Sequence, residues 1–142
     1  MKRGEAALLG LLLAGALGVR IWGLGQGYPQ FYGHVDEVGV AASIWNFFRS
    51  STLLPTEFTY PACYSYLVAV GLWASYWLGL IPDIGGCGDS LILYSFVDPA
   101  WSALVGRCLS AGASTSIVLF TYLLGRRACN RGIAGGAAVF VA

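Results

Sequence analysis

Long apolar runs, bounded by charged or turn-forming residues, dominate the hydropathy pattern of this chain. A membrane-spanning helix needs about 20 mostly apolar residues. Three runs are long enough, whereas the one that starts at Gly132 has only 11 residues. The pattern predicts an all-α, polytopic helical membrane protein in one domain, residues 1–142, with spans at about 5–24, 62–82 and 100–125 and the start of a fourth at 132–142.

The first run carries one charge within it, Arg20, which is followed by Trp22. An arginine near the end of a span extends to the headgroups, where tryptophan also concentrates, so Ala6–Leu24 is interpreted as an uncleaved span. The alternative is a cleaved signal peptide, because basic residues precede a short apolar core with small residues at 14–16. The apolar stretch beyond Arg20 favours the span.

Composition agrees with a membrane protein. Hydrophobic residues make up 57% of the chain, charged residues only 11%, and the mean hydropathy is +0.69. Soluble domains carry roughly 25% charged residues, so a soluble globular domain and a disordered chain are both excluded. The net charge of +1 provides no basic surface for nucleic acid. Four cysteines without a CxxC pair, and a single histidine, give no zinc-ligand pattern.

The distribution of basic residues conflicts with three crossings. Lys2 and Arg3 favour a cytoplasmic amino terminus. Three spans would then place the arginine cluster Arg126–Arg131 outside and the loop 83–98, which has no Lys or Arg, inside. Either one of the three runs does not cross fully, or helices elsewhere override the bias.

Residues 25–61, between the first two runs, are predicted to form an external loop that contains a helix. From Asp36 to Ser50, residues at spacings of three or four form a polar face and leave a broad apolar face with Trp45 and Phe48. The polar face consists of Gly39, Ser43, Asn46 and Ser50. Such a helix lies in the membrane interface. A helix packed against the spans of its own protein gives the same pattern, and the two interpretations are compatible.

Two adjacent acids, Asp36 and Glu37, open this helix and are the first candidate site residues. One interpretation is capping, since Asp is favoured at the N-cap and acids stabilise the positive end of the helix dipole. The other is chemical, because a carboxylate held at the membrane surface can act as a general base toward an attacking hydroxyl. His34, two residues earlier, either orients a substrate or hydrogen-bonds within the loop.

Tyr60 and Arg107 are further candidates near the second and third spans. Tyr60-Pro61 suits a helix start, because proline lacks only a donor that the first turn leaves unpaired, and Tyr60 belongs to an aromatic belt at headgroup level. Arg107 lies in an apolar run, where arginine is costly and marks a polar cavity, an ionic partner or an anionic ligand. If Arg107 lies near the end of the span, it extends to the headgroups instead.

The order of these features resembles the amino-terminal part of a known family. The features are a basic amino terminus, a first span ending in Arg20 and Trp22, GHVDE, an interfacial helix, LPTEFTYPACYSYLVAV, and WSALVGRCLSAGASTSIVLFTYLLGRRACNRGIAGG. They are similar to the GT-C glycosyltransferases related to the dolichyl-phosphate-mannose protein mannosyltransferases and the bacterial lipid A aminoarabinose transferases (glycosyltransferase family 39-like). The resemblance covers nearly the whole chain except 82–99.

The resemblance implies a membrane glycosyltransferase with a polyprenyl- or dolichyl-phosphate sugar as donor. Asp36, with Glu37 beside it, matches the family's catalytic base, which deprotonates an acceptor hydroxyl that attacks the anomeric carbon with inversion. Arg107 matches a recurrent family arginine, and Tyr60 stands where some relatives carry a basic residue; with His34 they are the candidate substrate-binding residues. No cofactor is implied, and two carboxylates are a thin basis for a divalent cation.

The implied partners are the lipid-linked donor, membrane lipids and an acceptor of undefined class, without nucleic acid. Family enzymes are several times longer, so the chain is expected to be an amino-terminal piece that is inactive alone, in a prokaryotic plasma membrane or the endoplasmic reticulum. The competing interpretation is a small non-catalytic multi-span subunit or scaffold in which Asp36 is only a cap. A transporter fragment has less support.

Overall fold

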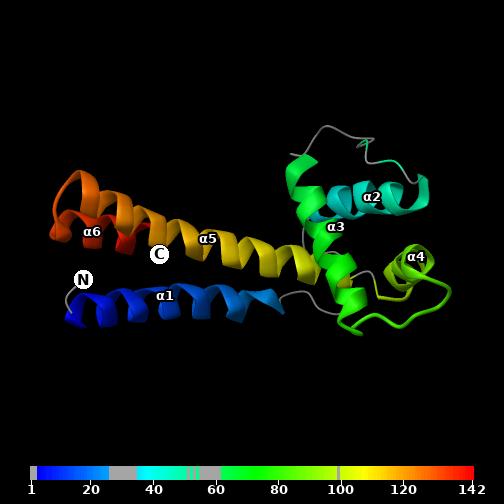
Figure 1. Cartoon of the computed structure of the whole chain (residues 1–142), viewed down its shortest axis with the longest axis horizontal. Helices are drawn as coiled ribbons and strands as arrows, with labels where there is room; N and C mark the ends of the chain where they lie inside the picture. Colours follow the sequence, from blue (N-terminus) through cyan, green and yellow to red (C-terminus); the bar gives the residue numbers. More distant parts are fainter. Residues whose placement is uncertain (1–2, 26–34, 51, 53, 55–61, 99) are drawn as a thin grey trace. The chain divides into compact units, whose positions relative to one another are not determined.

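The structure, a computed structural model, describes residues 3–25, 35–50, 52, 54, 62–98 and 100–142, without the side chains of residues 3, 35–37 and 96. Every regular element in these ranges is an α-helix, as the sequence predicts. In chain order the helices are α1 (Arg3–Leu24), α2 (Val35–Ser50), α3 (Ala62–Trp77), α4 (Cys87–Val97), α5 (Ala100–Ala128) and α6 (Arg131–Val141) (Figure 1).

Contacts divide the chain into two compact units, which we describe separately. The terminal unit combines Met1–Leu24 with Ser110–Ala142 and so contains α1, most of α5, and α6. The central unit, Gly25–Leu109, contains α2, α3, α4 and the beginning of α5. The long helix α5 therefore contributes to the core of both.

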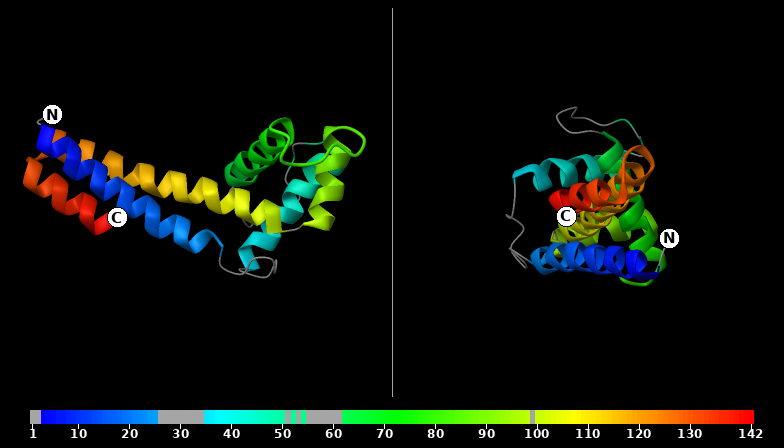
Figure 2. Two further views of the ribbon diagram at one scale, coloured as in Figure 1. Left: turned by 90° about the horizontal axis from the view of Figure 1, so that it is seen from below. Right: turned by 90° about the vertical axis from the view of Figure 1, so that its left-hand side faces the viewer.

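In the terminal unit, α1 runs antiparallel to α5 and parallel to α6 (Figures 1 and 2). At one end, Arg131 at the start of α6 pairs with Glu5 near the start of α1, with 2.5 Å between Nη1 and Oε1. Toward the other end, Arg20 Nε donates to Ser114 Oγ of α5 at 2.7 Å. The start of α1 and the turn between α5 and α6 therefore lie at the same end of this unit.

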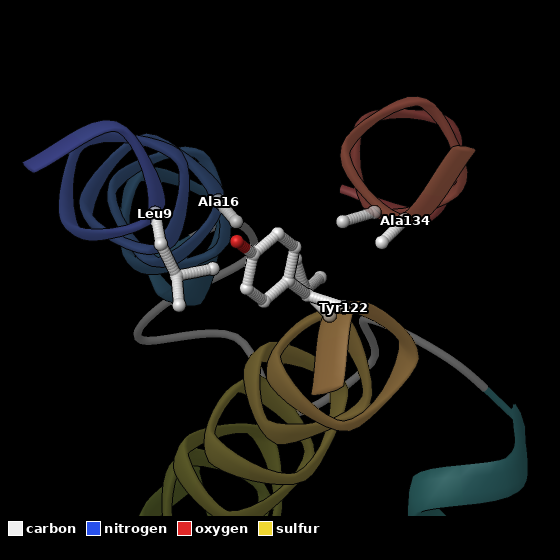
Figure 3. Close-up of a cluster of buried hydrophobic side chains, with 6 residues drawn as sticks. Leu9, Ala16, Tyr122 and Ala134 are labelled. Carbon is white, nitrogen blue, oxygen red and sulfur yellow. The ribbon is translucent and has the colours of Figure 1, made fainter. Parts of the chain in front are cut away.

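Small side chains and one tyrosine form the core of the terminal unit. The ring of Tyr122 on α5 lies between Ala16 of α1 and Ala134 of α6, and its hydroxyl points toward α1 (Figure 3). A Cβ on Gly125 would lie 3.0 Å from Cα of Ala134, so α5 and α6 approach this closely because residue 125 has no side chain. The buried members of this core are Leu9, Ala16, Val118, Tyr122, Ala134 and Ala138.

In the part of the chain that the structure describes, two helices are long and apolar enough to cross a membrane. They are Gly4–Leu24 within α1 and the whole of α5, Ala100–Ala128, and they correspond to the predicted spans 5–24 and 100–125. The predicted start of a fourth span at 132–142 is the short apolar helix α6.

The predicted span 62–82 is shorter in the structure. Its helix, α3, ends at Trp77 after 16 residues, about 24 Å along its axis, whereas the hydrocarbon layer is about 30 Å thick. Gly79 follows in the left-handed conformation, with φ of 73°. Gly79 N donates to Tyr76 O at 2.9 Å and Leu80 N to Ser75 O at 3.0 Å, the paired hydrogen bonds of a Schellman helix end.

In the central unit, α2 packs against α3 and α4. Ile44 is 1% exposed, and Phe47 stacks on Tyr66 with 5.1 Å between ring centroids. The sequence placed Ser43 on the polar face, yet Ser43 is buried and its hydroxyl donates to Gly39 O at 3.1 Å. Because that bond satisfies the hydroxyl, Ser43 can share the packed face with Val40 and Ile44. This segment is therefore a helix that packs against other helices of its own protein, whereas the expected packing against membrane spans stays a prediction.

The helix α4 lies where the sequence analysis expected only a loop, 83–98. Leu91, in the apolar stretch of α4, is buried in the core of the central unit. The stretch is too short for a span, and turn residues flank it on both sides, which is why hydropathy alone missed it. The buried core that α4 completes consists of Val40, Ile44, Val68, Leu72, Ile81 and Leu91.

Candidate functional site

A small pocket in the central unit lies between α2, α3 and the beginning of α5. Its volume is about 30 Å³, enough for a water-sized group, whereas ligand pockets usually measure about 300–1,000 Å³. We call it the α2–α5 pocket. Its walls are apolar except for the hydroxyl-bearing Tyr64 and Ser102, and its lining residues are Val40, Ala41, Ile44, Tyr64, Val68, Ser102, Ala103 and Gly106.

The two predicted acids belong to the helix that forms one wall of this pocket. Asp36 and Glu37 stand in the first turn of α2, four residues before Val40 and Ala41. Residues four apart share a helix face, about 6 Å apart along the axis. The backbone of both acids thus lies on the face of α2 that lines the pocket, one helical turn closer to the amino terminus than the lining residues. The side chains of both acids are outside the described atoms.

The predicted arginine belongs to the helix that forms the opposite wall. Arg107 follows Gly106 directly and lies one turn after Ala103, and both of those residues line the pocket. The Arg107 side chain is half-buried and makes a polar or charged contact. The structure therefore brings the helices of Asp36, Glu37 and Arg107 to one pocket, while His34 and Tyr60 lie outside the described residues.

Glycines hold the walls of this pocket close together. A Cβ on Gly106 would lie 2.9 Å from Tyr64 Oη, and one on Gly71 would lie 2.7 Å from Val105 Cγ1. Real Cβ atoms essentially never approach other atoms so closely. The absence of side chains at these two positions thus allows α3 to cross α5 at the pocket, as small residues do in membrane helix pairs.

A second polar cluster, which the sequence analysis did not single out, joins α3 to α4. Asp83 Oδ1 accepts from Gly86 N at 2.9 Å, from Gly85 N at 3.3 Å and from Ser90 Oγ at 3.3 Å. These backbone donors, Gly86 first, hold the pKa of the Asp83 carboxyl below its ordinary value. Gly85 and Gly86 have φ of 143° and 106°, so the sequence DIGG was the available indication of this turn.

The same turn raises the pKa of a neighbouring cysteine. Cys87 begins α4, and burial together with the nearby Asp83 carboxylate raises the pKa of its thiol. Only the thiolate is a good nucleophile or metal ligand, so Cys87 is a poor candidate for either role. In the described part of the chain, no three His, Cys, Asp or Glu side chains gather closely enough to hold a metal ion.

Comparisons with protein-family models, with curated proteins and with solved structures find no match to this chain.

Proposed function

We propose that this chain forms part of a membrane glycosyltransferase that takes its sugar from a polyprenyl- or dolichyl-phosphate donor, with Asp36 as general base. The order of sequence features that resembles such enzymes suggests the reaction. The observation that carries the proposal is the convergence of the helices of Asp36, Glu37 and Arg107 on the α2–α5 pocket.

The exposure of the long helices supports a membrane location. Only 11% of the apolar window in α1 and 17% of that in α5 is buried within the protein. Leu8 and Leu11 of α1 and Leu124 of α5 are each more than 60% exposed. A core helix of a soluble protein would be covered, whereas lipid is a favourable surrounding for such surfaces. We propose that α1 and α5 cross a plasma membrane and that α3 does not.

The proposed reaction takes place at the amino-terminal end of α2. Asp36 removes the proton of an acceptor hydroxyl, whose oxygen forms a bond to the anomeric carbon. The bond from that carbon to the phosphate oxygen breaks, and the phosphate leaves with the electron pair, which inverts the anomeric centre. Because the pocket is too small for a sugar, the donor lies outside it, and we propose Arg107, His34 and Tyr60 as the residues that bind the donor.

Asp36→Asn in the native-length protein tests the proposal. Asn has nearly the same shape as Asp but carries no charge and cannot take up a proton, so the fold is kept while the base is lost. We expect transfer from a radiolabelled polyprenyl-phosphate sugar in isolated membranes to fall by about 10²- to 10⁴-fold, the usual contribution of a general base. Asp89→Asn, at an exposed acid on α4, is the matched control and should transfer normally.

Transfer by Asp36→Asn at the wild-type rate would leave capping as the only role of this residue. Absence of transfer in the wild-type protein at native length, with normal membrane insertion, would favour the non-catalytic subunit.

A further inference from the structure

A groove in the terminal unit lies between α1 and α6, with α5 beneath it. Its volume is about 230 Å³, and the buried side chains of Leu9 on α1 and Tyr122 on α5 form its floor (Figure 3). Leu8 of α1 and Val139 of α6 also line it and are 72% and 62% exposed, so the groove is accessible from outside. We call it the α1–α6 groove.

The groove changes from charged to apolar along α1. At its charged end, Glu5 in the first turn of α1 pairs with Arg131, the first residue of α6. Leu9 and Leu12 follow Glu5 along the wall, since residues four and seven positions apart share one helix face. The seven residues from Glu5 to Leu12 correspond to about 10 Å of helix. The groove therefore has an ion pair at one end and an apolar wall about 10 Å long.

This order of charge and apolar surface matches that of a lipid in one leaflet. In the proposed membrane location Glu5 lies at the headgroup level, because it is the second residue of the apolar segment Gly4–Leu24. One leaflet contributes about 15 Å of hydrocarbon, so the apolar wall lies beside the upper part of the acyl chains. An apolar cavity of about 150 Å³ already holds benzene, so a groove of about 230 Å³ accepts several methylene groups of one chain.

The ion pair distinguishes between headgroups. The side chains of Arg131 and Glu5 are 56% and 20% exposed, so both charges can be reached at the end of the groove. A headgroup with a phosphate and a primary ammonium complements both, because Arg131 donates to the phosphate and the ammonium donates to the Glu5 carboxylate. An anionic headgroup without an ammonium would bring its phosphate near that carboxylate with no compensating charge.

We propose that the α1–α6 groove binds a zwitterionic phospholipid that carries a primary ammonium. One acyl chain lies along Leu9 and Leu12, and the headgroup lies at Glu5 and Arg131. The proposal requires that α1 crosses a membrane, which is part of the proposed location, and it is independent of glycosyl transfer.

Gly135 provides a variant that fills the groove. It lines the groove from α6, and a Cβ at this position would have no neighbour within 4 Å. Gly135→Leu therefore places a side chain where the acyl chain would lie. Gly136→Leu, at the adjacent exposed residue outside the lining, is the matched control. Both changes replace glycine by a strong helix former, so they should alter the stability of α6 alike.

Native mass spectrometry of the detergent-purified protein at native length measures lipid retention. The probes are phosphatidylethanolamine, phosphatidylglycerol and diacylglycerol with identical acyl chains. We expect the wild-type protein and Gly136→Leu to retain phosphatidylethanolamine in preference to the other two lipids. Gly135→Leu should reduce its retention by roughly tenfold or more, since displacing about two buried methylene groups is enough for that loss. Glu5→Gln should remove the preference over phosphatidylglycerol.

Three results would overturn the proposal: no preference for phosphatidylethanolamine in the wild type, undiminished retention by Gly135→Leu, or an equal loss in Gly136→Leu. If Gly135→Leu does not fold, Glu5→Gln decides, because loss of the headgroup preference supports the site and an unchanged preference rejects it. Asp36→Asn should retain the lipid as the wild type does, so that a failure of glycosyl transfer and a failure of lipid binding are separate results.

Discussion

Asp83 connects two helices through hydrogen bonds that only its charged form makes well. Its pKa is lowered in the folded protein, chiefly by the backbone N–H groups of Gly86 and Gly85. A carboxyl with a lowered folded pKa stabilises the fold above its unfolded pKa, near 3.9, and that contribution disappears as the pH falls through the folded value. The turn between α3 and α4 should therefore weaken in acid.

We expect Asp83→Asn to unfold at a lower temperature than the wild type near neutral pH and to lose less stability on acidification. Thermal unfolding followed by tryptophan fluorescence, from about pH 7 to about pH 3, measures both effects. Asp89→Asn serves as the control, because Asp89 is exposed and makes none of these bonds. Equal pH dependence in all three proteins would contradict the assignment.

Single residues show what a local pattern can and cannot predict. The helix expected at Asp36–Ser50 is confirmed as α2, Val35–Ser50, because its spacing of apolar residues is a local property. The sequence did not indicate that Arg20 donates a hydrogen bond to Ser114, 94 positions away, and the headgroup contact expected for Arg20 stays a prediction. That partner depends on how α1 packs against α5, which no local pattern contains. The catalytic role of Asp36 stays a prediction.

At the scale of elements, the long apolar helices were predictable and their ends were not. Hydropathy located α1 and α5 because length and composition define a span. It extended α3 to residue 82, since the residues after Trp77 remain apolar, whereas the Schellman motif at Gly79 stops the helix earlier. The backbone conformation of one glycine therefore decided whether this run has the length of a span.

The close approach of α5 and α6 at Gly125 gives a test at the same scale. We expect Gly125→Ala to destabilise the protein by about 1–3 kcal/mol, because the added Cβ would lie 3.0 Å from backbone Cα of Ala134 and the helices must separate. Gly136→Ala is the matched control. Residue 136 has no neighbour within 4 Å, so this change should be neutral or stabilise α6 by up to about 1 kcal/mol. Unfolding in denaturant measures both, and similar effects would refute the packing argument.

For the whole molecule, the contact of Glu5 with Arg131 bears on orientation. It places the start of α1 and the turn after α5 at the same end of the terminal unit. If α1 and α5 cross and α3 does not, Lys2 and Arg3 share one side of the membrane with Arg126 and its neighbours. Five of the eight basic residues of the chain then share one side, which agrees with the positive-inside rule and removes the conflict that three crossings created.

Labelling of single cysteines measures this topology. With the other three cysteines replaced by serine, Cys129 at the end of α5 should react with a membrane-impermeant maleimide from the cytoplasmic side only. A second protein, without native cysteines and with Gly25→Cys directly after α1, should react only from the opposite side. Labelling of both proteins from the same side would contradict a single crossing, by α5, between residues 25 and 129.

The terminal unit is assembled from the two ends of the sequence. Its first helix, α1, packs against helices of Ser110–Ala142, which are made after the whole of Gly25–Leu109. At about 5–20 residues per second, translation of that interval takes several seconds. If α1 crosses the membrane as proposed, it must stay inserted during this time by its own hydrophobicity, before Arg20 and Ser114 can form their hydrogen bond. Biogenesis would then include a stage in which α1 lies in the bilayer without its partner helices, and factors that bind single membrane helices would act at that stage.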